Sequence, residues 1–500
     1  MHAPRFLLRA SVVLGLLAGP ASAQVTPEQV WTFWQGLAQG AGYQMTATAQ
    51  RRDGARLILD GVEAAQISAT TSFRAPVGQV VMRDLGDGTV EITVPPRFEI
   101  TMAIREPDRD PVDMALTVEQ DGYVTVVSGT PEAPRYTVSA DALTVTVPNP
   151  VVDGKAMPMD LVVTLGGIRG ATLMVPGAPF ALSYDLSAEA IEIAMSAEDP
   201  QGDGTFDLSV GAQSLASQFE GTLPATIAPG TPLSDAMAAG LRGSGSYGAQ
   251  AIDFGMDLTG KGGTTSVAGS AAGGMVDFGL DPAGLRYRTG LTGLAVAASG
   301  AGIPVPDLQF SMAEYALGLT MPLVKSDTPS DFGFLLRLVD LVVSDDVWAL
   351  VDPQAALPRD PATLILDTTG KVTLFHDLTS PEAERAPVPG QVEQVTIDAL
   401  QLKAMGADLT GTGAFAFDNA DTATFPGFPR PFGTADLLLT GGNALLDRLT
   451  ALGFVPAEQV FMVRAIMAMV ATPGAGPDTL TSRLEITPDA RILANGQRLR

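Results

Sequence analysis

Apolar and polar residues alternate along most of the chain after residue 42. Alternation with a period of two places successive side chains on opposite faces of a strand. Turn-forming pairs, such as Asp53-Gly54 and Asp87-Gly88, separate neighbouring runs and are typical of hairpins. Because strand follows strand with almost no helix between them, the pattern predicts a mainly β protein, an extended curved antiparallel sheet or sandwich built of successive hairpins. Clear runs lie at 57–59, 90–94, 143–147, 161–165, 315–323 and 332–338.

The spacing becomes helical near the N-terminus. Thr26 is placed to cap a helix, Pro27 suits its first position, and Gln29 completes a capping box. We expect this helix either to pack its aromatic face on the sheet or to cover the open end of an apolar groove. Its apolar face includes two of the three tryptophans of the chain and consists of Val30, Trp31, Trp34, Leu37 and Ala38.

A helical hairpin is predicted near the C-terminus, over residues 443–471. Asn443 is placed to cap the first helix, Gly453 ends it, and Pro456 begins the second. The second helix, from Ala457 to Ala471, is apolar around most of its circumference. It is therefore either buried between the sheet and the first helix or exposed as a lid or a membrane-contacting element. From both helical regions we select a candidate cover for an apolar ligand, namely Trp31, Trp34, Leu445, Leu449, Phe461 and Met467.

The middle of the chain, residues 236–300, is rich in Gly, Ala and Ser and contains a weak repeat. The hexapeptide at 252–257 (IDFGMD) returns at 276–281 (VDFGLD), an offset of 24 residues. One hairpin fits this period, so we expect the segment to add successive hairpins to the sheet. We divide the chain into a signal peptide (1–23), an N-terminal helix with a β-rich half (24–235), and a second half with the Gly-rich hairpins and the helical hairpin (236–500).

The first 23 residues have the form of a cleavable signal peptide. Arg5 and Arg9 supply its positive charge, residues 11–18 form a short apolar core, and Ala21-Ser22-Ala23 provides the small residues that signal peptidase requires. We predict cleavage after Ala23 and a periplasmic or otherwise extracytoplasmic location. The most apolar later segment, 461–471, contains Arg464 and is too short to span a bilayer, so we predict no transmembrane span after signal removal.

The composition excludes several kinds of chemistry. The chain has 500 residues, no cysteine and two histidines, and signal removal also removes His2, so disulfides, thiolates and His-rich metal sites are excluded. A Ser-His-Asp site would need His376, yet no G-x-S-x-G elbow is present. We therefore predict a protein that is not an enzyme and uses no cofactor or metal. Without Arg5 and Arg9, 28 basic residues face 55 acidic ones, and the resulting charge of −27 disfavours binding to nucleic acid.

Three short motifs stand out along the chain: Val30-Trp31-x-x-Trp34 followed by Gly42-Tyr43, the block from Trp348 to Pro361 (W-x-x-x-D-P, then L-P-R-D-P), and Asn495-Gly496-Gln497. Together they resemble the domain-of-unknown-function 2125 family, which consists of exported, functionally uncharacterised proteins of Gram-negative bacteria. The resemblance extends over nearly the whole chain after residue 23. More remotely, the hairpin at 409–413 (LTGTG) is similar to hairpins of AsmA-like envelope proteins, whose long curved sheets form lipid-accommodating grooves. This second likeness concerns the fold alone.

These features predict a non-enzymatic extracytoplasmic protein that binds a lipid or another apolar ligand of the envelope, or an envelope protein. The alternating strands, the helices with apolar faces and the lack of catalytic side chains motivate this hypothesis. The alternative is a structural or surface interaction module with a solid core and no ligand cavity, in which the acidic hairpins serve solubility and assembly.

Overall fold

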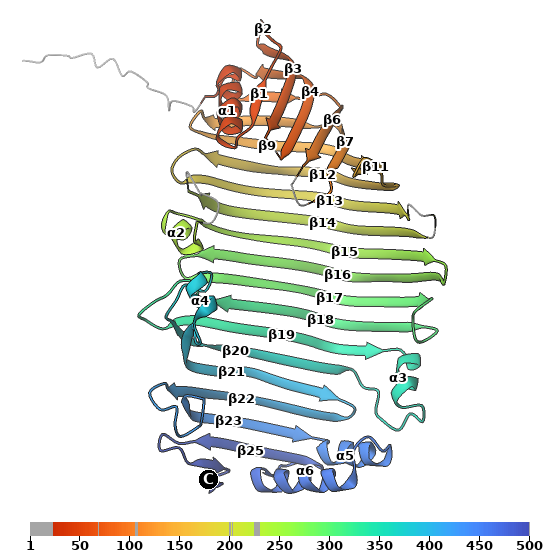
Figure 1. Ribbon diagram of the computed structural model, residues 1–500, viewed down its shortest axis with the longest axis vertical. Helices are drawn as coiled ribbons and strands as arrows, with labels where there is room; N and C mark the ends of the chain where they lie inside the picture. The colour runs from red at the N-terminus through yellow and green to blue at the C-terminus, as the bar shows by residue number, and fades with distance from the viewer. Residues whose placement is uncertain are drawn as a thin grey trace, which may run out of the picture.

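The computed structural model describes residues 24–499, except 69, 106–108, 200–201, 203 and 225–230. The predicted signal peptide therefore lies outside the described residues. The strands of the described chain join in one antiparallel sheet, in which strands that are neighbours in the chain mostly pair as hairpins (Figure 1). The predicted mainly β fold is confirmed, and it takes the form of one extended sheet rather than a sandwich.

The N-terminal end of the sheet contains the main buried core of the described chain. Helix α1 (Pro27–Gly40) places Val30 and Trp31 against Leu59, Met82 and Ile92, all nearly inaccessible to solvent. The strands around it are β1 (Gln44–Thr46), β2 (Ala49–Asp53), β3 (Arg56–Ile67), β4 (Thr71–Asp84), β5 (Val90–Thr93), β6 (Arg97–Ile104), β7 (Val112–Asp121), β8 (Val124–Thr130), β9 (Ala133–Pro148), β10 (Val151–Val152) and β11 (Lys155–Ala156).

The start of α1 follows the predicted capping box. The N–H of Gln29 donates to the Thr26 hydroxyl over 3.3 Å, and the N–H of Thr26 donates to the Gln29 side-chain oxygen over 2.9 Å. Both bonds satisfy backbone donors that a helix start otherwise leaves unpaired. The prediction for this helix is confirmed.

The strands become much longer beyond this core, reaching 19 residues in β13 to β16. The two copies of the hexapeptide lie on two neighbouring strands, β15 and β16. The 24-residue offset therefore corresponds to one strand and its turn, and the expectation of one hairpin per offset was wrong. These strands are β12 (Met159–Val175), β13 (Phe180–Glu198), β14 (Thr205–Leu223), β15 (Arg242–Gly260), β16 (Gly263–Asp281), β17 (Gly284–Gly300), β18 (Leu308–Met321), β19 (Ser330–Val343), β20 (Ala362–Leu374), β21 (Gly390–Ala404), β22 (Ala407–Asp418), β23 (Arg430–Thr440), β24 (Thr472–Pro473), β25 (Thr479–Ile486), β26 (Ile492–Ala494) and β27 (Gln497–Arg498). The boundary predicted at 235/236 falls between β14 and β15, which are hydrogen-bonded neighbours.

A line of residues with left-handed backbone crosses the long strands. Ser214 on β14, Ala251 on β15 and Asp340 on β19 have φ of 51°, 46° and 55°. In β14 the less exposed apolar positions are even-numbered up to 212 and odd-numbered from 215 to 221, and the two residues at the change, 213 and 214, are both exposed. A bulge-like residue of this kind resets the alternation, so we infer that apolar side chains stay on one face along the whole strand.

Three short helices lie at the strand ends: α2 (Leu233–Ala238), α3 (Asp345–Val351) and α4 (Pro381–Arg385). Helices α2 and α4 lie at the same edge of the sheet as α1, and α3 lies at the opposite edge (Figure 1). The carboxylate of Asp377, in the loop before α4, accepts hydrogen bonds from the N–H of Lys325 (2.8 Å) and from the Ser234 hydroxyl of α2. These two bonds lower the pKa of Asp377. Asp377 thus connects its own loop to α2 and to the loop that contains Lys325.

The block from Trp348 to Pro361 forms a compact turn after α3. The fully buried carboxylate of Asp352 accepts hydrogen bonds from the N–H groups of Ala356 (3.0 Å) and Leu357 (2.8 Å). The guanidinium of Arg359 lies 5.8 Å from the ring centre of Trp348. Arg359 also pairs with Asp345 at the start of α3, so the Asp352 and Arg359 contacts give these parts of the motif a structural role.

The predicted helical hairpin is confirmed as α5 (Gly442–Ala451) and α6 (Ala457–Val470), at the end of the sheet opposite α1 (Figure 1). The prediction that Asn443 caps α5 was wrong. Asp478, which directly precedes β25, caps the helix instead. Its carboxylate accepts hydrogen bonds from the N–H groups of Asn443 (3.2 Å) and Ala444 (2.9 Å). Gly441 precedes the helix with φ of 72° and allows the tight turn into it.

Candidate apolar ligand site

One face of the sheet carries a continuous row of apolar and aromatic side chains. Residues directly opposite each other in an antiparallel pair lie on the same face, so the register defines the row. It crosses the strands from β9 to β20 through Tyr136, Thr172, Tyr184, Phe219, Gly245, Phe278, Tyr287, Leu319, Phe334 and Thr368. We call the surface that this row defines the apolar face.

The apolar face is only partly covered by the described chain. From Tyr184 to Thr368 every member of the row is half-buried or exposed, and Tyr287 and Leu319 each keep 37% of their surface accessible. This contrasts with the N-terminal end, where α1 covers the same face and buries it. The middle of the sheet therefore presents apolar side chains without a packed layer of described chain above them.

Four aromatic side chains form a cluster in the middle of the row. The rings of Tyr184 and Phe219 lie 5.5 Å apart, and Phe278 lies 6.2 Å from both Phe219 and Tyr247. The hydroxyls of Tyr184 and Tyr247 are hydrogen-bonded at 2.8 Å, and this bond raises the pKa of Tyr247. Gly245 lies beneath the cluster, where a Cβ atom would approach Phe278 to 2.7 Å. The absence of a side chain at Gly245 allows the rings to lie close to the backbone.

The α1 end of the apolar face contains a half-open pocket of about 320 Å³. Burial raises the pKa of Tyr136 to about 12, although the neighbouring Trp34 acts in the opposite direction, and the Tyr136 hydroxyl is buried without a hydrogen bond of good geometry. A cavity with apolar walls and a few polar groups suits an apolar ligand with one polar atom. Its walls consist of Trp34, Leu37, Ile92, Val94, Tyr123, Thr125, Tyr136, Val138, Thr172, Met174 and Leu186.

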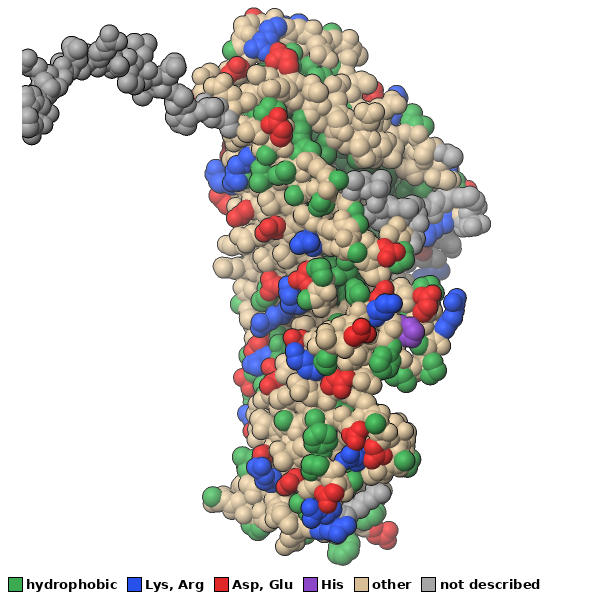
Figure 2. All heavy atoms as spheres, turned by 90° about the vertical axis from the view of Figure 1, so that its left-hand side faces the viewer, with side chains coloured by type: hydrophobic (Ala, Val, Ile, Leu, Met, Phe, Trp, Pro, Cys, Tyr) green, Lys and Arg blue, Asp and Glu red, His purple; other side chains and the backbone are tan. Residues whose placement is uncertain are grey.

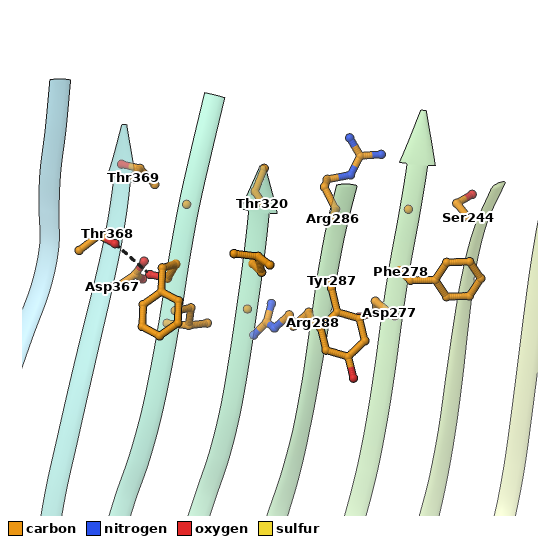
Figure 3. A pocket seen from close by; sticks show the side chains of 16 residues that line it. Ser244, Asp277, Phe278, Arg286, Tyr287, Arg288, Thr320, Asp367, Thr368 and Thr369 are labelled. Atoms are coloured by element: carbon orange, nitrogen blue, oxygen red, sulfur yellow. Dashed lines mark hydrogen bonds between the residues drawn. The ribbon is translucent and has the colours of Figure 1, made fainter. Parts of the chain in front are cut away.

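The opposite face of the sheet is polar. Figure 2 shows charged side chains on both long sides of the molecule, including the lobes that project from one of them. A hollow of about 480 Å³ on the polar face is lined by charges of both signs, including Asp277 on β16, Arg288 on β17 and Asp367 on β20 (Figure 3). Arg286 at its rim pairs with Asp281 at 3.1 Å. The Thr369 hydroxyl at the hollow donates a hydrogen bond to the carboxylate of Asp398 over 2.7 Å.

Candidate catalytic and metal-binding groups are sparse within residues 24–499 as described. No group of three or more His, Asp or Glu side chains there is placed to hold a metal ion. The half-buried His376 lies in the loop after β20. None of the described helices has the length and hydrophobicity of a membrane span.

The structure separates the six residues selected from the sequence into two groups. Trp34 lines the cavity beneath α1, whereas Trp31 is 3% exposed and belongs to the N-terminal core. Leu445, Leu449, Phe461 and Met467 lie in α5 and α6 at the other end of the sheet (Figure 1). Of these four, Phe461 is 76% exposed and the others are half-buried.

The residues of the aromatic cluster and Tyr136 were not selected from the sequence. Tyr184 and Tyr247 are 63 residues apart, and only the register of three strands brings them together. The alternation within each strand was the usable signal, since it places aromatic residues on the apolar side of that strand. It does not say which strands are neighbours.

Comparison with known proteins supports the resemblance found in the sequence. Residues 251–488 match the model of a family described as uncharacterized proteins conserved in bacteria (DUF2125). The match includes the block from Trp348 to Pro361, and it confirms the resemblance to the domain-of-unknown-function 2125 family for this part of the chain. No curated protein and no solved structure matches the chain significantly. The likeness to AsmA-like proteins stays a prediction.

Proposed function

We propose that this protein is a non-enzymatic extracytoplasmic protein that binds an elongated apolar molecule, such as the acyl chains of a lipid, on the apolar face of its sheet. The observation that carries the proposal is the half-exposed row from Tyr184 to Thr368. Monomeric soluble proteins rarely leave contiguous apolar patches larger than a few hundred Å² in water, and larger patches mark binding surfaces.

Ligand binding would remove the energetic cost of this open surface. Each Å² of apolar surface removed from water contributes about 25 cal/mol. The half-open pocket beneath α1 supplies a concave end for the ligand, with the Tyr136 hydroxyl as a polar group that a ligand oxygen can satisfy. The ligand would therefore lie across the strands, with one end beneath α1 and its apolar body over the aromatic cluster.

The proposed location rests on the signal peptide predicted for residues 1–23, and the family match agrees with a bacterial protein. The net charge of −25 for the full chain favours a ligand whose exposed part is neutral, because a strongly acidic protein repels other anions. The proposal that the protein is not an enzyme rests on the scarcity of histidine and on the lack of cysteine.

Two substitutions on neighbouring residues of β18 test the proposal. Leu319 lies on the apolar face, and Thr320 lines the hollow on the polar face. We expect Leu319→Asp to weaken binding of a fluorescently labelled neutral lipid by at least about tenfold, since a charge would face the hydrocarbon. Thr320→Asp should leave binding unchanged, and circular dichroism should show that both variants fold. Equal binding by the two variants would contradict the proposed face.

The alternative is an interaction module that assembles with other proteins through this face. Under that alternative the chain binds no neutral lipid, and the Leu319→Asp variant loses a protein partner instead. The half-open pocket beneath α1 favours a small apolar ligand over this alternative, because a concave site with apolar walls and a few polar groups suits such a ligand.

A further inference from the structure

The outward surface of α6 is apolar although it faces solvent. Phe461, Met462, Ile466 and Met469 are 76%, 60%, 55% and 61% exposed, whereas Val460 on the other side of the helix is buried. The exposed residues are spaced by one, three, four or five positions and therefore share one broad face of the helix. We call these four residues the α6 patch. The alternative in which this helix is buried between sheet and helix was wrong.

The charged residue in the body of α6, Arg464, points toward α5, and its side chain is 39% accessible. Arg464 donates hydrogen bonds to the carbonyl oxygen of Asn443 (3.2 Å) and to the carboxylate of Asp447 (2.7 Å), both on α5. Surface helices of globular proteins normally direct charge to solvent and apolar residues to the core. The inverted arrangement of α6 indicates that its outer face contacts something apolar.

We infer that the α6 patch inserts into the surface of a lipid membrane that is neutral or zwitterionic. The area of the patch is on the order of 500 Å². A stable protein dimer buries about 800 Å² on each partner and surrounds an apolar centre with hydrogen-bonding groups. The α6 patch is smaller than this, and its four residues offer no side-chain hydrogen-bonding group, so a lipid surface fits it better than a second copy of the chain.

The charge of this region supports the same choice. Residues 442–470 contain two acidic residues, Asp447 and Glu458, and two basic residues, Arg448 and Arg464. The helical hairpin is therefore locally neutral within a chain of net charge −25. Because the helical hairpin has no net charge, a lipid surface does not repel it as it would repel the acidic remainder of the protein. The hairpin also has no cationic patch, so its binding does not require anionic lipid.

The helical hairpin is anchored firmly enough to present this surface. Asp478 holds the first turn of α5, and Arg464 joins the two helices. Exposed Phe454 (53%) lies in the turn that joins α5 to α6 and extends the apolar surface. Insertion of a helix face by this route needs no membrane-spanning segment. The inference concerns a different surface from the proposed ligand face, so either can fail without the other.

Vesicle flotation of the chain from Gln24 to Arg500 tests the inference. The probes are vesicles of phosphatidylcholine alone and vesicles that also contain phosphatidylglycerol. The chain should float with phosphatidylcholine vesicles, and Phe461→Ser combined with Ile466→Ser should reduce the bound fraction about tenfold or more. The matched control is Phe428→Ser in the loop between β22 and β23, because Phe428 is 72% exposed but lies outside the α6 patch. This variant should bind as the wild type does.

Three results would overturn the inference. One is that the unaltered chain fails to float, another is that the α6 variant floats as well as the Phe428→Ser control, and the third is binding only to vesicles with phosphatidylglycerol. A dimer in analytical ultracentrifugation that the α6 variant converts to a monomer would assign the patch to a second copy instead. Since all three substituted residues are exposed, thermal unfolding should show folded proteins, and ligand content by native mass spectrometry tests the proposed function separately.

Discussion

The hydroxyls of Tyr184 and Tyr247 lie 2.8 Å apart although 63 residues separate the two tyrosines in the chain. Tyr184 is opposite Phe219 on β14, and Phe219 is opposite Gly245 on β15, two residues before Tyr247. The bond therefore connects β13 to β15 across the strand between them. It places two polar atoms in the middle of an otherwise apolar surface and fixes the positions of the rings beside them.

A double-mutant cycle measures this connection. Tyr184→Phe and Tyr247→Phe each remove one hydroxyl. The coupling free energy between the two substitutions should be above zero but less than about 1 kcal/mol, since the pair is partly exposed to water. Urea unfolding of the single and double variants provides the measurement. A coupling of zero would show that the two hydroxyls do not bond in solution.

Gly245→Ala is expected to destabilise the sheet by about 1 to 3 kcal/mol. The new Cβ would lie 2.7 Å from a ring carbon of Phe278 and 2.8 Å from the carbonyl oxygen of Gln218, and the second of these is backbone that cannot move easily. Gly248→Ala on the same strand is the control, because its nearest neighbour would be 3.8 Å away. Equal unfolding free energies for the two variants would contradict the close packing of Phe278 on this strand.

Tyr136→Phe is expected to leave the free energy of unfolding unchanged or to raise it slightly, because it deletes a buried hydroxyl that lacks a good hydrogen bond. In the wild type, ultraviolet titration should show one tyrosine that ionises near pH 12, and this signal should be missing from the variant. A loss of more than about 1 kcal/mol in the variant would mean that the hydroxyl has a partner in solution.

Asp478→Asn should destabilise the helical hairpin by about 1 kcal/mol, since Asp478 caps α5. Partial burial opposes ionisation, but hydrogen bonds from Ala444 and Asn443 outweigh it and lower the pKa of Asp478. A carboxyl group whose pKa is lower in the folded state adds stability above its unfolded pKa, and this stability is lost as the pH falls through the folded value.

The wild type should therefore lose more stability than Asp478→Asn as the pH falls below about 4. Unfolding monitored by circular dichroism at several pH values gives the comparison. Parallel pH profiles for the two proteins would contradict the capping role of this carboxylate.

Local signals in the sequence were sufficient for the elements whose contacts are local. The capping box of Thr26 and Gln29 and the limits of the helical hairpin could be predicted because each depends on residues a few positions apart. The cap on α5 could not, since Asp478 is 35 residues from Asn443. The surface role of α6 was also ambiguous, because a helix that is apolar all round does not reveal which side meets the sheet.

The candidate site depended on information that no single strand contains. Alternation predicted an apolar side for each strand, but Ser214 and Ala251 change its phase within their strands. Strand neighbours and register then decide that Tyr184, Phe219 and Phe278 form one cluster. A prediction of this cluster from sequence would have required the pairing of strands whose aromatic residues lie up to 94 positions apart, which one sequence does not supply.

Native mass spectrometry of the chain from Gln24 to Arg500, purified from the envelope without detergent, tests the central claim most directly. The account predicts a stoichiometric mass increment that organic solvent removes and that lipid analysis of the extract identifies as an apolar molecule. The Leu319→Asp variant should lose this increment and Thr320→Asp should retain it. A protein that carries no additional mass in all three forms would contradict ligand binding on the apolar face.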